Sequence, residues 1–224
     1  LKAASLKLPI NKALGFAYIV CFKNSVCVDG KWVKVPTPTF IIGYKGLVQL
    51  ALRSGQYKNI NADLVYEGEL RKVNKLTGEI DFEGERKSDK VVGYFCHFEL
   101  LNGFSKTLYM TVEQVATHAK KYSKGLKEGV TVSDLMGLSD LPVLASSKAV
   151  GWLGNFNGMG LKTVTRLLLS KYGYLSVEMQ AAIVADMKSE NIEDKVSDEI
   201  DNSGATVDVG FEEIKEEKGE ELPD

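Results

Sequence analysis

The sequence predicts a mixed fold, in which antiparallel hairpins and separate helices share a chain of 224 residues. Two turn signals indicate the hairpins, because Asp29-Gly30 and Asn102-Gly103 each lie between runs rich in β-branched and aromatic residues. Apolar residues at helical spacing over 44–54 and a capping box over 111–114 indicate helices. The chain is long enough to bury one sizeable core.

Strands flank one complete helix, over 44–54, in the first half of the chain. Lys45, Gln49 and Arg53 recur at every fourth position of this helix, so they share one face with a cation at each end. A solvated face and a phosphate-contacting face both fit that pattern. The expected elements are, in order, the end of a helix over 1–8 that Pro9 stops, strands at 17–22, 26–28, 31–35 and 39–42, a helix over 44–54 that Gly55 ends, and a strand over 59–67.

The second half combines a charged excursion with a hairpin and further helices. Ser176 is the expected N-cap of the last helix, whose apolar positions include Val177, Ala181 and Val184. The expected elements are an exposed excursion over 69–90 with a short strand at 80–82, hairpin strands over 91–101 and 104–110, a helix over 111–122, a long loop over 125–150, a basic helix after a glycine-rich stretch, and a last helix from about 177.

Charge divides the chain into two parts of opposite sign. Residues 186–224 hold 15 of the 30 acidic groups and 4 of the 28 basic ones, a net charge of −11, whereas residues 1–185 carry +9. We therefore expect a core domain over 1–185 and an acidic, disordered tail over 186–224. A basic body favours a polyanionic partner, although a soluble domain with a solubilising tail fits the same numbers.

Cysteine and histidine usage argues against a metal site and against a disulfide framework. The three cysteines, Cys21, Cys27 and Cys96, include no C-x-x-C pair, and His97 and His118 are too few for a zinc site. We expect no metal, no cofactor and a reducing cytoplasmic setting. No apolar run approaches the roughly 18 residues of a membrane span, so we expect no membrane association.

Residues 151–173 form the most distinctive stretch of the sequence. Four glycines and Trp152 precede a basic helix on which Lys162 and Arg166 share one face. The stretch is similar to a nucleotide-binding loop, but Leu161 separates the last glycine from Lys162, so the Walker spacing fails. No strand precedes it in a βαβ unit and no catalytic motif occurs elsewhere, so we expect no enzyme activity and no catalytic residues.

Basic residues stand beside aromatic residues or glycines in three separate places. Single-stranded nucleic-acid sites combine a cationic groove with flat side chains, so the three places together predict nucleic-acid binding. Complementation of a helix dipole explains the second place equally well, and a core position explains Trp152 equally well. The three places are Tyr44-Lys45 with Arg53 and Lys58, Lys120-Lys121-Tyr122 with Lys124, and Trp152 with Lys162 and Arg166.

Longer matches resemble a known family over about residues 6–180. They are Leu6-Lys-Leu-Pro9, Leu14-Gly-Phe-Ala-Tyr18, Ile42-Gly-Tyr-Lys-Gly-Leu-Val-Gln-Leu-Ala-Leu-Arg-Ser-Gly-Gln-Tyr57, Ile60-Asn61, Tyr66-Glu-Gly68, Phe98-Glu-Leu-Leu-Asn-Gly103, Met159, Leu161-Lys-Thr-Val164, Leu169-Ser-Lys-Tyr-Gly173 and Leu175-Ser-Val-Glu-Met-Gln180. On these residues the sequence resembles the RecT branch of the RecT/Redβ family of phage single-strand annealing recombinases. Family members often have acidic residues where Asn155 and Asn157 stand here, and alanines where Gly158 and Gly160 stand.

The resemblance implies an α+β fold, with a curved antiparallel β-sheet and packed helices forming a Redβ/Rad52-like annealing core. It implies ATP-independent binding of single-stranded DNA, annealing of complementary strands in phage-type homologous recombination, retention of the annealed duplex, and self-assembly into rings or helical filaments. The implied partners are a phage exonuclease and a host single-strand-binding protein, in the cytoplasm of a bacterial host with a phage- or prophage-encoded gene. Members normally carry a helical segment before the position of Leu1, so we expect this chain to be truncated at its N-terminus.

The resemblance also implies which residues contact DNA. They are Tyr44, Lys45, Arg53, Lys121, Lys162, Thr163 and Arg166, and the neighbouring Lys120, Lys124 and Trp152 complete the three basic places. Two other functions remain open. One is a nucleotide-binding phosphotransfer enzyme that uses residues 154–163 as its loop, and the other is a structural nucleic-acid-binding protein that does not anneal strands.

Overall fold

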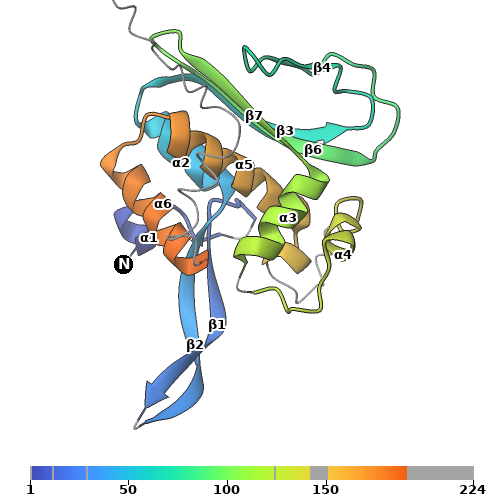
Figure 1. The fold of residues 1–224 in the computed structure, drawn as a ribbon. Coiled ribbons are helices and arrows are strands. Elements are labelled where there is room, and N and C mark those ends of the chain that lie inside the picture. The colour runs from blue at the N-terminus through green and yellow to red at the C-terminus, as the bar shows by residue number, and fades with distance from the viewer. Residues whose placement is uncertain (1, 12, 29, 124, 142–150, 191–224) are drawn as a thin grey trace, which may run out of the picture.

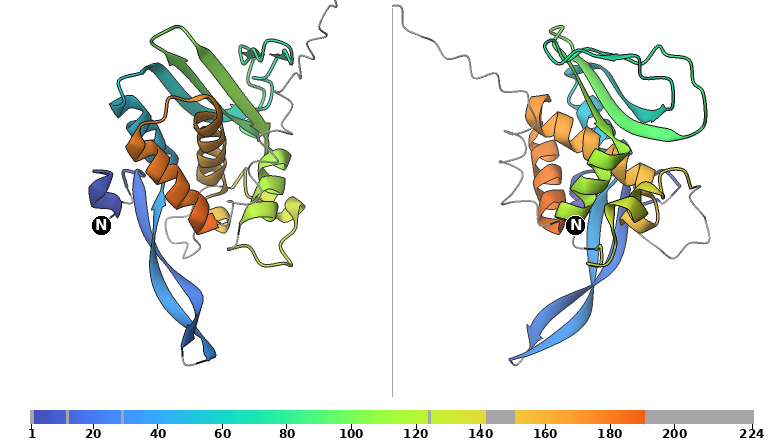
Figure 2. Two further views of the ribbon diagram at one scale, coloured as in Figure 1. Left: turned by 60° about the vertical axis from the view of Figure 1, so that its left-hand side comes forward. Right: turned by 45° about the vertical axis from the view of Figure 1, so that its right-hand side comes forward.

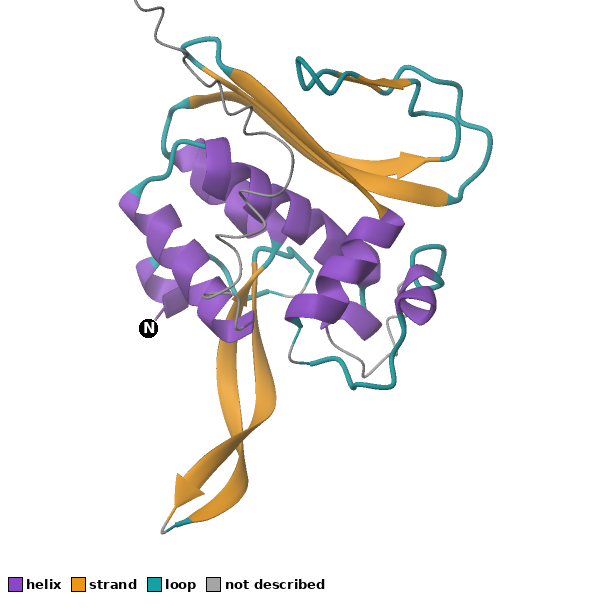
Figure 3. Cartoon of the chain, viewed as in Figure 1, coloured by secondary structure: helices purple, strands orange, loops and turns teal. Residues whose placement is uncertain are grey.

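The computed structural model describes residues 2–11, 13–28, 30–123, 125–141 and 151–190. It confirms an α+β fold with antiparallel sheets, in which a three-stranded sheet lies on one side of the helices and a long hairpin extends from the other side (Figure 1). Figure 3 shows most of the helices gathered between these two strand systems. A closer likeness to a Redβ-type annealing core stays a prediction. None of the described helices is long and apolar enough to cross a membrane.

Strands and helices follow one another along the chain as separate runs. The strands form three antiparallel sheets, of which only one has more than two strands among the described residues. The elements are α1 (Lys2–Ser5), β1 (Ala17–Val28), β2 (Lys31–Ile42), α2 (Tyr44–Arg53), β3 (Tyr57–Tyr66), β4 (Lys72–Val73), β5 (Ile80–Asp81), β6 (Val91–Leu100), β7 (Ser105–Thr111), α3 (Val112–Tyr122), α4 (Val132–Met136), the 3₁₀ turn η1 (Gly151–Leu153), α5 (Phe156–Tyr172) and α6 (Val177–Glu190).

The central sheet has the order β3-β6-β7 and carries the core of the protein. The predicted hairpin of β6 and β7 is confirmed, with Gly103 at a φ of +87° in its turn. On the face of β6 that packs against α5, Tyr94, Cys96 and Phe98 are fully buried. The sheet therefore forms the platform on which α5 lies.

β1 and β2 form a hairpin that projects from the body as a two-stranded arm (Figure 2). Its strands are longer than predicted, because β2 continues through Pro36 and Pro38. Proline is tolerated there since each strand of a two-stranded sheet has a free edge. The base of the arm is buried, with Ala17 and Ile42 at 0 and 1% exposure, whereas Trp32 near its tip is 75% exposed.

The start of α2 lies directly against the segment that enters the arm. A Cβ added at Gly43 would lie well under 3.0 Å from the carbonyl oxygen of Gly15, and one added at Gly46 would lie equally close to that of Phe16. The N–H of Gly43 also donates to the Phe16 carbonyl at 2.9 Å. Both glycines are needed because backbone occupies the space of their side chains. This packing holds the first turn of α2 at the base of the arm.

α3 begins at the capping box that the sequence predicts. The Thr111 side chain accepts from the N–H of Gln114, and the Gln114 side chain accepts from the N–H of Thr111. The predicted loop over 125–150 is partly wrong, because α4 forms within it at a second capping box between Thr131 and Asp134. Residues 142–150 of that loop lie outside the described residues.

α5 begins earlier than predicted. Asn155 is its N-cap and accepts a hydrogen bond from the N–H of Gly158 at 2.8 Å. Gly158 and Gly160 are therefore part of the helix rather than of an open glycine-rich loop, which corrects the sequence-based expectation. The preceding residues from Gly151 to Leu153 form a single 3₁₀ turn.

α6 is confirmed, but it is buried on a different face from the one predicted. Val177, Ala181 and Val184 are exposed, and the buried face carries Met179 and Ile183 instead. Apolar residues surround the whole circumference of this helix, so their spacing does not select one face. The expected domain boundary between residues 185 and 186 falls inside α6, and residues 191–224 lie outside the described part.

Candidate nucleic-acid interface

The two cations predicted on α5 meet an acidic side chain inside the protein. Nζ of Lys162 lies 2.6 Å from Oδ1 of Asp186, and Nη1 of Arg166 lies 3.0 Å from Oδ2. The three residues are only 2–3% exposed. Each carboxylate oxygen thus holds one cation in a charge-assisted hydrogen bond, in surroundings that screen charge less than water does. We refer to these three residues as the α5–α6 ion cluster.

Helix geometry explains how the cluster forms. Lys162 and Arg166 are one turn apart on α5, and Asp186 follows Ala182 by one turn on the buried face of α6. α6 therefore covers the cationic face of α5. The sequence predicts that this face contacts DNA phosphate, but in this conformation neither cation is accessible, so the contact stays a prediction that requires another position of α6.

Trp152 and Thr163, also predicted to contact DNA, belong to the interior. Trp152 is 6% exposed, and its ring centroid lies 5.5 Å from that of Phe156. The hydroxyl of Thr163 donates to the carbonyl of Met159 at 2.9 Å, one turn earlier in α5. Of the two interpretations of Trp152, the core aromatic describes this conformation. A DNA base cannot stack on a ring that is packed in this place.

Residues that depart from the family pattern at the start of α5 have structural partners. A Cβ added at Gly160 would lie 2.9 Å from the ring of Tyr94. The Tyr94 hydroxyl donates to Oδ1 of Asn157 at 2.6 Å, and Nδ2 of Asn157 donates to the carbonyl of Ser139 at 2.8 Å. Burial raises the pKa of Tyr94 far above its usual value, so the phenol remains a donor at neutral pH. Asn157 is suited to this place because a carboxylate has no donor for Ser139.

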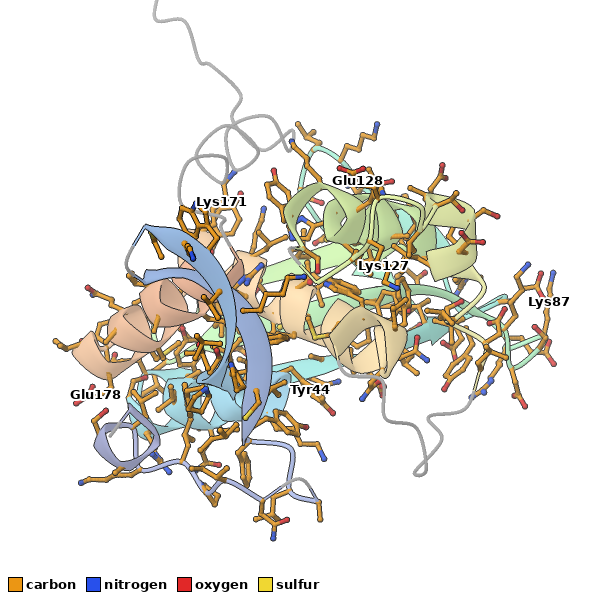
Figure 4. All side chains as sticks on the ribbon, turned by 90° about the horizontal axis from the view of Figure 1, so that it is seen from below. Tyr44, Lys87, Lys127, Glu128, Lys171 and Glu178 are labelled. Atoms are coloured by element: carbon orange, nitrogen blue, oxygen red, sulfur yellow. The ribbon has the colours of Figure 1, made fainter. Side chains whose placement is uncertain are left out.

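The first turn of α2 carries Tyr44 and Lys45 close to the base of the arm, and Figure 4 shows Tyr44 there. Lys45 is exposed and Tyr44 is half-buried. Burial, followed by the nearby Asp63 and Tyr18, raises the pKa of Tyr44, so its hydroxyl stays protonated. An accessible cation beside a phenol can contact a phosphate and a neighbouring sugar or base.

At the other end of α2, Arg53 binds the N-terminal segment of the chain. Nη1 donates to the carbonyl of Leu6 at 2.8 Å, and Nη2 donates to that of Lys7 at 2.9 Å. Lys7 has a φ of +50°, and this left-handed conformation helps to present the two carbonyls. In this conformation the Arg53 side chain therefore has a structural role.

The basic residues at the end of α3 divide between structure and surface. Nζ of Lys120 donates to the carbonyl of Glu128 at 2.6 Å and so fastens the following loop, on which Figure 4 shows Lys127 and Glu128. Lys121 is exposed, with Nζ 5.1 Å from the centroid of the Tyr122 ring. Lys124 lies outside the described residues.

The predicted residues do not come together on one surface. Lys45 and Lys121 are exposed on α2 and α3, whereas the cations of α5 are inside. Sequence reasoning missed Asp186, which it assigned to the tail. The sequence holds no local signal for it, because apolar residues on all sides of α6 leave open which face is buried.

Sequence reasoning predicted the hairpin of the arm but did not count it among the places that combine cations with an aromatic ring. Lys31 and Lys34 are exposed beside Trp32, which repeats the pattern of cations next to an aromatic ring. The signal was present in the sequence, but the pattern was sought only outside the hairpin. The arm therefore adds a fourth place where cations and an aromatic ring are accessible together.

A hollow of about 540 Å³ lies on the other side of the central sheet, against the excursion that contains β5. It is bordered by Asn61, His97 and Thr107, and the Nδ1 atom of His97 lies 2.9 Å from the Thr107 hydroxyl oxygen. The part of the chain that the structure describes has no group of three metal-ligating side chains. The hollow thus offers polar and aromatic surface without a metal centre.

Comparison with known proteins gives concordant matches. The model of the RecT family matches residues 1–199. The chain is 43% identical over 202 residues to the uncharacterized protein YqaK of Bacillus subtilis (strain 168), an alignment that covers 90% of this chain and 58% of that protein. It is 28% identical over 191 residues to Protein RecT of Escherichia coli (strain K12), covering 84% of this chain and 60% of that protein. The chain thus spans about three fifths of the length of both relatives.

Proposed function

This chain belongs to the RecT family, and on that premise we propose that it binds single-stranded DNA and anneals it to a complementary strand without ATP during recombination. The observation that carries the proposal is the match over residues 1–199, because it includes every element of the fold. Membership implies a role in recombination and annealing. To that role the proposal adds strand binding, independence of ATP and the residues involved.

Accessible cations support binding to a polyanion. Residues 1–185 carry a net charge of +9, and Lys45, Lys121, Lys31 and Lys34 are all exposed. Phosphates of one strand would lie along these side chains while the bases stay accessible to a second strand. Pairing and stacking are downhill, so the protein needs only to reduce phosphate repulsion and to hold the strand extended. Each phosphate that it neutralises adds about 0.7 to the slope of log affinity against log salt concentration.

Assembly and partners belong to the same proposal. Family membership implies self-association, and protomers placed side by side would keep a strand extended over many nucleotides. We also propose, on the family premise alone, that a phage exonuclease supplies the single strand, that a host single-strand-binding protein is a partner, and that the reaction takes place in the bacterial cytoplasm.

A fluorescence-quench annealing assay without nucleotide tests the central claim. Complementary oligonucleotides, one with a fluorophore and one with a quencher, should pair faster with the protein than alone. Pairing at the spontaneous rate despite clear binding would favour a structural nucleic-acid-binding protein that does not anneal. Absence of binding at low salt would exclude the proposal altogether.

Paired charge removals test whether Lys45 and Lys121 contact phosphate. Lys45→Ala combined with Lys121→Ala should lower the salt slope by about 1.4, since two phosphates would lose their partners. The matched control is Lys87→Ala combined with Lys90→Ala, which removes the same charge from exposed positions on or beside the excursion (Figure 4 shows Lys87). Equal losses in both double variants would mean that binding follows net charge and not these two positions.

A nucleotide-dependent enzyme is not favoured. The stretch that such an enzyme would use as a phosphate loop, residues 154–163, is largely the start of α5, and Lys162 is buried against Asp186. A phosphate-binding loop needs open backbone N–H groups and an accessible lysine. Hydrolysis of ATP, or a change in annealing rate on its addition, would bring this alternative back.

A further inference from the structure

The carboxylate of Asp186, on α6, contacts the two cations of α5 where a phosphate group bound by them would lie. Its two oxygens contact Lys162 at 2.6 Å and Arg166 at 3.0 Å, one oxygen to each cation. A phosphate of a DNA strand offers the same pair of anionic oxygens to the same donors. We propose that α6 is a latch in which Asp186 competes with DNA phosphate for Lys162 and Arg166, and that bound single-stranded DNA displaces α6. The inference rests on the proposed function and adds a regulation of its binding site.

Because Lys162 and Arg166 are buried, they can contact either Asp186 or a DNA phosphate, but not both at once. The side chains of Lys162 and Arg166 are 4 and 3% exposed, so a phosphate cannot reach them while α6 is docked. When α6 moves, both cations lose the Asp186 carboxylate, and a phosphate can take its place in the same charge-assisted hydrogen bonds. A DNA strand already bound at the exposed cations would supply that anion at high local concentration.

The fold allows α6 to leave without disturbing the central sheet of β3, β6 and β7. α6 packs on β2 and α2 through a single face with Met179, Ala182 and Ile183, and its opposite side is exposed. α5 is held by the central sheet and also by α2, on which α6 packs as well. The link between the two helices is fastened where the Tyr57 hydroxyl donates to the carbonyl of Tyr174 at 2.8 Å. α6 can therefore pivot about this link while α5 stays in place.

The acidic residues that follow α6 in the sequence also favour displacement of α6 when DNA binds. Residues 191–224, which follow α6 in the sequence, carry a net charge of −10. Phosphates that approach the basic body repel this acidic segment. Binding of DNA would therefore weaken the docking of α6 even before a phosphate reaches Lys162.

Hydrogen exchange of the full wild-type chain tests the latch without any substitution. With a saturating single-stranded oligonucleotide, amides of α6 should exchange faster, whereas amides of α5 and β6 should keep their protection. Unchanged or increased protection of α6 with DNA bound would overturn the latch. It would leave the proposed function intact, because binding would then be shown in the same sample.

Titrations with a labelled oligonucleotide over a series of salt concentrations measure DNA affinity and its salt slope, and these test the latch in a second way. Asp186→Asn should bind roughly tenfold more tightly or better, since less of the protein stays in the closed, non-binding form. Adding Lys162→Gln and Arg166→Gln to Asp186→Asn should cancel this gain and lower the salt slope by about 1.4. Asp186→Glu, which keeps the anion, should bind as the wild type does.

A charge control separates the latch from a general electrostatic effect. Asp89→Asn makes the same change in net charge at a side chain that is 97% exposed and paired only on the surface with Arg86. It should leave affinity unchanged. Equal affinities of Asp186→Asn and the wild type, or an equal gain in Asp89→Asn, would overturn the latch. No binding by the wild type and by Asp186→Asn alike would overturn the proposed function and the latch with it.

Discussion

Gly46→Ala should destabilise the protein because backbone fills the space beside Gly46. An added Cβ would lie well under 3.0 Å from the carbonyl oxygen of Phe16 and 2.8 Å from Cγ1 of Ile42. The Phe16 carbonyl already accepts from the N–H of Gly43 at 2.9 Å. That oxygen cannot move without weakening this bond, so the first turn of α2 would have to shift away from the base of the arm.

Opposing contributions set the size of the effect. Alanine is favoured over glycine in a helix by about 1 kcal/mol. Overpacking a well-packed site costs about 1–3 kcal/mol, and the weakened hydrogen bond costs about 1 kcal/mol more. The free energy of unfolding should therefore fall by about 2 kcal/mol, which for a domain of this size lowers Tm by roughly 4–8 °C.

Thermal and urea denaturation followed by circular dichroism would measure this loss. Gly137→Ala is the matched control, because Gly137 has a φ of −60° and an added Cβ would meet its nearest atom at an ordinary 3.5 Å. The control should be as stable as the wild type. Oligonucleotide affinity should also fall in Gly46→Ala, since a shift of α2 moves Lys45. A wild-type Tm in Gly46→Ala would refute the packing argument.

Three further outcomes follow from buried groups. A thiol-reactive dye at pH 8 should modify the exposed Cys21 and Cys27 quickly and Cys96 only after unfolding, and three fast thiols would contradict the burial of Cys96. Burial raises the pKa of Cys96 from 9.0 to about 12. The Cys96 thiol therefore ionises at lower pH in the unfolded chain than in the folded one, and the free energy of unfolding, measured in urea, should fall as pH rises from about 9 to 12. Asn157→Asp should cost about 1–3 kcal/mol of that free energy at pH 7, since the carbonyl of Ser139 loses its donor, whereas an unchanged urea midpoint would mean that another group replaces it.

Local signals in the sequence predicted the elements that local physics determines. The Asn102-Gly103 pair predicted the hairpin of β6 and β7, and the capping box at Thr111 predicted the start of α3. These signals work because turn geometry and helix caps depend on residues within four positions of each other. The same kind of signal between Thr131 and Asp134 marked α4, although the expectation of a long loop passed over it. Family membership was likewise readable from ordered matches along the chain, and the family model confirms it.

Tertiary structure decided which side of each element meets solvent. The spacing of Lys162 and Arg166 established that the two cations share a face of α5, but not that α6 covers this face. Apolar residues around all sides of α6 left its docking face open, and the packed core selected the side with Met179 and Asp186. A helical period specifies which residues are neighbours on a surface. The partner of that surface comes from residues far along the chain, so no local pattern could show that the predicted phosphate site is already occupied by a carboxylate.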